Sequence, residues 1–194
     1  MVTSAVGLLN IYEYTMSYKN ATPSTGYLNN GLYWWTLTPE STSNISTISG
    51  DGEIGYIELM YAYGLRPVIT LKFNVEIVSG TGTASDPYRL KGDNDTPTSG
   101  TKLATRYSGE YVRFGTGENN LYQIVSHETE GMTKITSAMP LKESENIKTM
   151  AFASSGSNYS SSNTIGAFLN GEYLTNESYL TTAQVNMIED NTTW

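Results

Sequence analysis

Cysteine is absent from this chain of 194 residues, and histidine occurs once, at position 127. Without thiols there can be no disulfide, no thiolate zinc site, no iron–sulfur cluster and no cysteine nucleophile. A catalytic triad or a histidine-based metal site would have to be built on His127 alone. His127 belongs to no recognised motif and stands at the end of a predicted strand. We therefore expect a polar strand-end residue there, and a protein without metal, cofactor or enzymatic activity.

Charge is also scarce, because only 15% of the residues are Asp, Glu, Lys or Arg, against about a quarter in typical proteins. The net charge is −8, and the 11 basic residues are scattered along the chain. A nucleic-acid binder needs a basic surface that displaces counterions from phosphates, and an anionic membrane surface attracts basic segments in the same way. We therefore expect neither partner.

Long apolar runs are missing too. None approaches the roughly 18 residues of a membrane helix, so we expect no membrane insertion. The first six residues lack the basic and apolar regions of a signal peptide, which places any export signal outside this chain.

Ser, Thr, Asn and Gly, together with 15 tyrosines, take the place of charge. These residues favour strands and turns over helices, and this composition is common in exported proteins. We therefore expect an extracellular or cell-surface protein with an α+β, β-dominated fold, in which antiparallel sheets carry a few short helices.

Alternation and turn residues locate the elements. Helical spacing predicts short helices over residues 5–18, 164–173 and 181–188, the last capped by Thr181 or Thr182. A Ser-Gly-Asp-Gly turn at 49–52 predicts a hairpin, and the stretch 154–163, rich in Ser, Gly and Asn, predicts an exposed loop. The predicted strands are Tyr33–Leu37, Ile45–Ile48, Gly55–Met60, the alternating run Gly64–Val78, Gly109–Phe114, Leu121–His127 and Thr133–Ala138.

The polar stretch 91–105 is the predicted linker between a first half, residues 1–90, and a second half, residues 106–194. Asp93, Asn94 and Asp95 offer oxygen atoms there, but the spacing and terminal Glu of an EF-hand are missing, so we predict no calcium site. The carboxylate pairs Asp51 with Glu53, and Glu143 with Glu145, stand in turns or polar runs. We expect them to be solvated charges, not the acid and base of a glycosidase.

Three motifs of the first half resemble one family: the Trp34-Trp35 strand, the stretch Gly64-Leu65-Arg66-Pro67-Val68, and the turn-rich segment 79–88, SGTGTASDPY. The family is the C-type-lectin-like repeat domain of bacterial surface proteins of the Firmicutes type, distantly similar to the formylglycine-generating-enzyme fold. Those enzymes act through cysteines that this chain lacks, so the resemblance does not imply their activity.

The second half resembles the opening half of such a domain, whereas the first half resembles its closing half, so the order of the parts is reversed. Residues 7–14 would be expected to follow the region of Trp194. Three arrangements are open. The halves pair within one chain as a circular permutation or a fragment, each half completes a domain with a neighbouring chain, or they form two small independent domains. Completion between chains would give a head-to-tail polymer and would bury the strand edges of each half.

The leading functional hypothesis is therefore a structural subunit or repeat of an extracellular filament or surface fibre that associates with itself. The alternative is an adhesin-like module that binds carbohydrate or protein through the loops 39–50 and 154–163. Aromatic faces bind sugars well, and neighbouring residues of a strand point to opposite faces, so one of the two tryptophans is expected in the core. Arg66 is expected to be a structural hydrogen-bond donor. The predicted ligand-binding residues are Tyr33, Trp34, Trp35, Asn44 and Tyr159.

Overall fold

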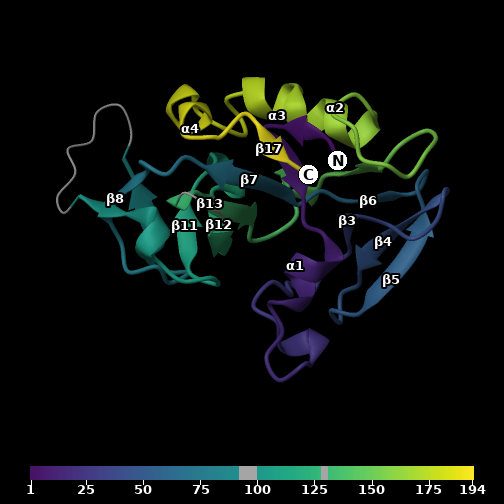
Figure 1. Ribbon diagram of the computed structural model, residues 1–194, viewed down its shortest axis with the longest axis horizontal. Helices are drawn as coiled ribbons and strands as arrows, with labels where there is room; N and C mark the ends of the chain where they lie inside the picture. The colour runs from purple at the N-terminus through teal and green to yellow at the C-terminus, as the bar shows by residue number, and fades with distance from the viewer. Residues whose placement is uncertain (92–99, 128–130) are drawn as a thin grey trace.

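The computed structural model describes residues 1–91, 100–127 and 131–194. It contains two main sheets, and strands from both halves of the chain form the larger one (Figure 1). The fold is α+β and β-dominated, as the composition predicts. In spatial order the eight strands of the larger sheet are β10 (Thr101–Lys102), β8 (Glu76–Ser79), β9 (Tyr88–Leu90), β11 (Tyr111–Arg113), β12 (Leu121–His127), β13 (Thr133–Ser137), β7 (Pro67–Leu71) and β2 (Val6–Leu8).

The two halves meet directly within this sheet. Strand β7 pairs antiparallel with β13, with Ile69 opposite Ile135, and β9 pairs parallel with β11, with Tyr88 opposite Val112. The halves therefore share one sheet within a single chain and are not two independent domains. Of the predicted linker, residues 92–99 lie outside the described residues, and β10 belongs to the sheet through its pairing with β8.

The smaller sheet has five strands, and it contains the predicted tryptophan strand and the predicted hairpin. In spatial order they are β16 (Thr149–Ala151), β6 (Ala62–Gly64), β3 (Trp34–Pro39), β4 (Asn44–Ile48) and β5 (Ile54–Glu58). The turn at 49–52 closes the hairpin, and Gly52 has the positive φ of 89° that such a turn requires.

Two short ladders complete the strand structure. One pairs β14 (Lys142–Glu143) with β15 (Asn146–Ile147), and the other pairs β1 (Thr3–Ser4) with β17 (Thr192–Thr193). Beyond β1 and β17, Val2 and Trp194 exchange both backbone hydrogen bonds. The two ends of the described chain therefore lie side by side (Figure 1).

The helices are short and gather mostly on one side of the sheets, where Figure 1 shows α2, α3 and α4 in a row. Their bounds are α1 (Ile11–Thr15), α2 (Thr164–Asn170), α3 (Glu172–Thr175) and α4 (Thr182–Asn186), and single 3₁₀ turns cover Pro23–Thr25, Leu103–Thr105 and Gly117–Asn119. The predicted cap is confirmed, because the Thr181 hydroxyl accepts a hydrogen bond from Gln184 N. None of these helices has the length and apolar character of a membrane span.

The sequence-based helix over residues 5–18 is wrong in its first half. Val6–Leu8 form β2, which pairs with β7, and the helix begins only at Ile11, where Asn10 and Glu13 make a capping box. The apolar spacing of this stretch suits a helix, but pairing with β7 buries Val6 and Leu8 completely. Tertiary pairing therefore overrides the local pattern.

The predicted alternating strand Gly64–Val78 is divided into β6, β7 and β8. All five residues of β7 are buried, because the sheet has a hydrophobic cluster on each face. Val68 packs in a cluster with Trp34, whereas Ile69 packs in the larger cluster with Trp35. A strand covered on both faces need not alternate.

Candidate recognition site

Both predicted tryptophans are core residues, which corrects the expectation that one of them could contact a ligand. Trp34 and Trp35 have no exposed surface, because β3 lies between β6 and β4 and carries a hydrophobic cluster on each face. The Trp34 ring lies 5.4 Å from the ring of Tyr14, edge to face. The Trp35 Nε1–H donates to the carbonyl of Met150 at 2.8 Å. A stacking platform on β3 is therefore absent.

Tyr159 is also buried, with 7% of its surface exposed, so its prediction as a ligand-binding residue is wrong for this structure. Its hydroxyl donates to the Val6 carbonyl at 2.6 Å and accepts from the Asn170 amide at 2.9 Å. Ser157 is buried beside it in the same loop. The loop 154–163 is thus anchored by two inward side chains, and its exposed part is smaller than its composition predicts.

Tyr33 and Asn44 remain at the surface. Tyr33 is 58% exposed, and its ring lies 5.9 Å from that of Tyr63 in an edge-to-face contact. Asn44 is half-buried at the start of β4, opposite Glu58. The structure brings neither residue to Trp34, Trp35 or Tyr159 in a common surface site.

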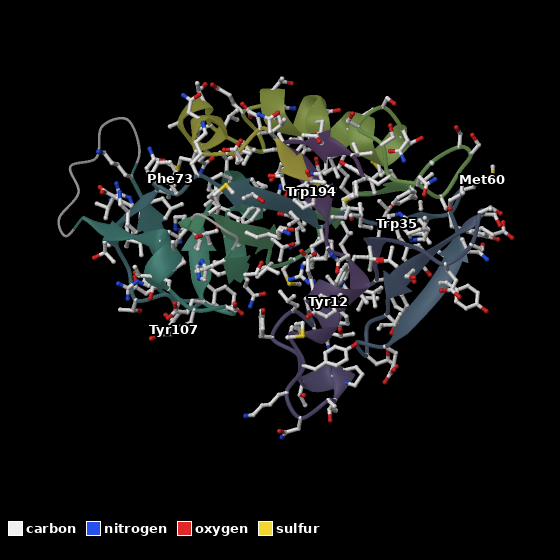
Figure 2. All side chains as sticks on the ribbon, in the orientation of Figure 1. Tyr12, Trp35, Met60, Phe73, Tyr107 and Trp194 are labelled. Atoms are coloured by element: carbon white, nitrogen blue, oxygen red, sulfur yellow. The ribbon has the colours of Figure 1, made fainter. Side chains whose placement is uncertain are left out.

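A pocket of about 270 Å³ joins the two loops that the sequence predicts for recognition. Thr42 and Ser43 line it from the first loop, and the segment 154–156 lines it from the second. Glu58, Leu59 and Met60 lie between the loops. Figure 2 shows Met60 at the edge of the molecule, and its side chain is 70% exposed.

The backbone of Leu59 holds both loops in place. Its N–H donates to the Ser43 carbonyl at 3.0 Å, and its carbonyl accepts from Phe152 N at 2.9 Å and from Ala153 N at 3.3 Å. The Leu59 side chain is only 4% exposed and so supplies an apolar base. Four of the other lining residues, Thr42, Ser43, Ser154 and Ser155, carry hydroxyl groups. A mainly apolar pocket with a few polar groups beside it suits a small neutral ligand that has both an apolar face and hydroxyl groups.

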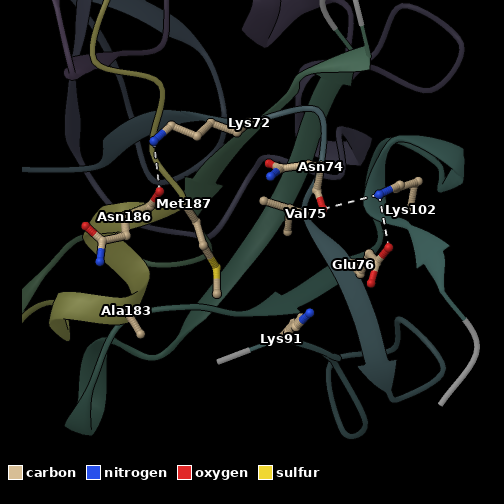
Figure 3. A pocket seen from close by; sticks show the side chains of 9 residues that line it. All are labelled: Lys72, Asn74, Val75, Glu76, Lys91, Lys102, Ala183, Asn186 and Met187. Carbon is tan, nitrogen blue, oxygen red and sulfur yellow. Dashed lines mark hydrogen bonds and ion pairs between the residues drawn. The ribbon is translucent and has the colours of Figure 1, made fainter. Parts of the chain in front are cut away.

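A larger pocket of about 630 Å³ lies between α4 and the β8–β10 edge, and sequence reasoning missed it (Figure 3). Three of its lining residues, Lys72, Lys91 and Lys102, are basic. Lys72 Nζ donates to the Asn186 carbonyl at 2.9 Å, and Lys102 Nζ pairs with Glu76 at 3.0 Å. Two of the three lysines therefore hold neighbouring elements together, which is a structural role.

The remaining candidates for chemistry also have structural partners. The ring nitrogens of His127 contact the Arg106 carbonyl at 2.6 Å and the Thr133 hydroxyl at 3.1 Å. Hydrogen bonds from the Ser49 hydroxyl and from backbone amides lower the pKa of Asp51 in its exposed turn, and Glu143 pairs with Lys148 at 3.1 Å. Through these contacts, each of the three side chains stabilises a turn or a strand end.

No group of three His, Asp or Glu side chains that could hold a metal ion occurs in the part of the chain that the structure describes. Asp93, Asn94 and Asp95 lie outside it.

No protein-family profile, no curated protein and no solved structure matches this chain.

Proposed function

We propose that this protein is a non-enzymatic recognition module of an extracellular or surface-displayed bacterial protein, and that it binds a neutral sugar in the pocket between residues 42–43 and 154–156. The observation that carries the proposal is the meeting of two loops, more than a hundred residues apart in the chain, at one apolar base formed by Leu59. Hydroxyl and carboxylate groups at the rim would hydrogen-bond to sugar hydroxyls, and Leu59 and Met60 would contact the C–H face.

The size and charge of the pocket support this ligand class. The volume of about 270 Å³ lies just below the usual range of roughly 300–1,000 Å³ for ligand pockets, so it fits one sugar ring better than several side chains of a peptide. Glu58 is the one charged residue of the lining, so an anionic ligand is disfavoured. The C-type-lectin-like resemblance and the composition of exported proteins agree with this proposal, and both remain predictions.

Ligand-dependent melting with a panel of neutral mono- and disaccharides tests the proposal. A binding sugar should raise the melting temperature in proportion to the logarithm of its concentration above Kd. Ser155 lines the pocket and is exposed, so Ser155→Trp should fill the pocket and abolish the shift. Ser161 is exposed in the same loop but does not line the pocket. Ser161→Trp is therefore the matched control and should keep the shift.

Two results would reject the pocket: no sugar of the panel shifts the melting temperature, or Ser155→Trp keeps the full shift.

A second candidate function is self-association by exchange of halves, in which β13 of a neighbouring copy would replace the β13 of the same chain that pairs with β7 here. Residues 1–91 alone would leave β7 with one neighbouring strand, β2, and would expose the edge that β13 covers. If β13 of a neighbouring copy took this place, every copy would both give and receive a half, and a polymer would grow. Oligomers larger than a dimer, measured by light scattering, would support this role.

A further inference from the structure

The larger pocket, between α4 and the β8–β10 edge, concentrates positive charge in an acidic protein. Lys72, Lys91 and Lys102 line it, and Glu76 is the one acidic residue of its lining. The whole chain has 11 basic and 19 acidic residues, so the balance of charge in the pocket is the reverse of that in the chain. We call this site the lysine pocket. Its volume of about 630 Å³ lies within the usual range for ligand pockets.

Backbone hydrogen bonds fix the places from which the three lysines extend. Lys72 N donates to the Met187 carbonyl at 2.9 Å, and Lys91 N donates to the Glu76 carbonyl at 3.0 Å. Lys102 lies opposite Glu76 in the ladder of β10 and β8. The lysine pocket is therefore built on backbone that the fold already holds together, as a preformed site requires.

The ammonium groups of the lysine pocket are only partly used by the fold. Lys72 Nζ donates to the Asn186 carbonyl, and Lys102 Nζ pairs with Glu76. Lys91 is exposed, and its side chain makes no hydrogen bond or ion pair with the described residues. Each ammonium group has three N–H donors, so donors remain for a ligand. Three cations beside one carboxylate also repel one another, and a bound anion would relieve that repulsion.

The lysine pocket also has an apolar base. Figure 3 shows Lys72 on one side and Lys102 on the other, with the side chains of Val75 and Met187 between them. Val75 is buried and Met187 is half-buried. A bare inorganic ion would leave this apolar surface uncovered. An organic anion would cover it and meet the lysines as well.

We propose that the lysine pocket binds a small phosphate ester, with the phosphate at Lys91 and Lys102 and the organic part against Val75 and Met187. Ammonium groups act as point charges that approach a phosphate from separate directions. The lining contains no arginine, whose flat fork matches a carboxylate. A phosphate monoester carries a charge of about −1.5 to −2 at neutral pH, which suits a lining with three lysines and one glutamate.

The charge of the rest of the protein limits the size of the ligand. The net charge of −8 repels a long polyanion wherever it leaves the lysine pocket, so a small ester is favoured over a nucleic acid. The site is independent of the proposed sugar pocket, because the two share no lining residue.

Isothermal titration of the intact chain, at an ionic strength held constant with sodium chloride, tests the proposal with three probes: phenyl phosphate, inorganic phosphate and phenol. Phenyl phosphate should bind. Inorganic phosphate should bind more weakly because it cannot contact the apolar base, and phenol should bind more weakly because it lacks the charge. Lys91→Gln should weaken the binding of phenyl phosphate by about tenfold or more, because a hydrogen bond to a charged group is lost.

Lys19→Gln is the matched control, because it removes the same charge at an exposed side chain outside the lysine pocket. It should bind phenyl phosphate as the wild type does, and both variants should keep the wild-type melting temperature. The proposal is overturned if phenyl phosphate does not bind, if Lys91→Gln binds it as tightly as Lys19→Gln does, or if inorganic phosphate or phenol binds equally well. Ser155→Trp should leave phenyl phosphate binding unchanged, so failure of the sugar site is distinguished from failure of this one.

Discussion

Arg66 carries its charge in the interior with no exposed surface. Its Nε donates to the Ser137 carbonyl at 2.7 Å, its Nη1 donates to the Leu28 carbonyl, and its guanidinium lies 4.9 Å from the centre of the Trp34 ring. The sequence-based expectation of a structural donor is confirmed. Burial lowers the pKa of Arg66 to about 9, because the charged form loses its hydration. The side chain connects the loop before β3 to the end of β13.

Replacement of Arg66 should therefore be costly. Arg66→Met keeps much of the volume but leaves the carbonyls of Leu28 and Ser137 without their donors, at about 1–3 kcal/mol for an unsatisfied buried group. We expect the free energy of unfolding to fall by about 3 kcal/mol in urea titrations. Arg113 is exposed on β11, so Arg113→Met should change the free energy of unfolding by less than about 0.5 kcal/mol. Equal effects of the two substitutions would contradict this role.

At the scale of an element, the edge of β2 depends on one side chain of α2. Asn170 gives Val6 both an acceptor and a donor, as a neighbouring strand would. The same amide donates to the Tyr159 hydroxyl and to the Gly166 carbonyl. This contact joins residues that are 164 positions apart and ties helix α2 to the larger sheet. Its loss would leave a buried backbone N–H without a partner.

We expect Asn170→Ala to lower the free energy of unfolding by about 1–3 kcal/mol, the cost of an unsatisfied buried group. The amide proton of Val6 should also exchange faster with solvent, as followed by hydrogen–deuterium exchange. Asn186→Ala is the control, because Asn186 is exposed and its side chain makes no hydrogen bond among the described residues. If Val6 stays as protected in Asn170→Ala as in the control, the side chain does not cap this edge.

Elements with a local signal could be predicted from the sequence, and those formed by distant pairing could not. The hairpin of β4 and β5 and the strands β11, β12 and β13 were predicted because turns and apolar runs mark them within short windows. Strand β2 was missed because only its pairing with β7 distinguishes it from a helix. The candidate site divides in the same way. The two recognition loops could be predicted from their composition, but the burial of Trp34 and Tyr159 depends on the sheets and helices that cover them.

At the scale of the whole molecule, the two ends of the chain and its two halves are interlocked. The Trp194 indole donates to the Ser4 carbonyl at 2.9 Å and lies over Gly7, where a Cβ atom would come within 2.4 Å of the ring. Both ends of the chain therefore lie beside β2, in a structure whose larger sheet takes strands from both halves.

The tyrosines that the fold buries or partly buries make the stability of the whole protein sensitive to alkaline pH. Burial raises the pKa of eight tyrosines in the described residues: Tyr14, Tyr18, Tyr27, Tyr88, Tyr122, Tyr159, Tyr173 and Tyr179. Each is neutral in the folded protein at a pH where its unfolded counterpart, with a pKa of about 10, has lost its proton. Their contribution to stability is therefore fully present below pH about 10 and is lost as pH rises through the folded pKa values.

Arg66 acts in the opposite direction, because burial lowers its pKa in the folded protein relative to the unfolded chain, where it lies above about 12. One arginine opposes eight tyrosines, so the free energy of unfolding should fall steeply between pH about 10 and about 12, by about 1.4 kcal/mol per pH unit for each tyrosine that titrates only when unfolded. Urea titrations over this range, with tyrosinate absorbance as a second signal, measure the slope. The pKa of Tyr159 is raised to about 12, so Tyr159→Phe should make the slope shallower by one proton. A Tyr159→Phe slope equal to that of the wild type would show that this hydroxyl titrates as freely in the folded chain as in the unfolded one.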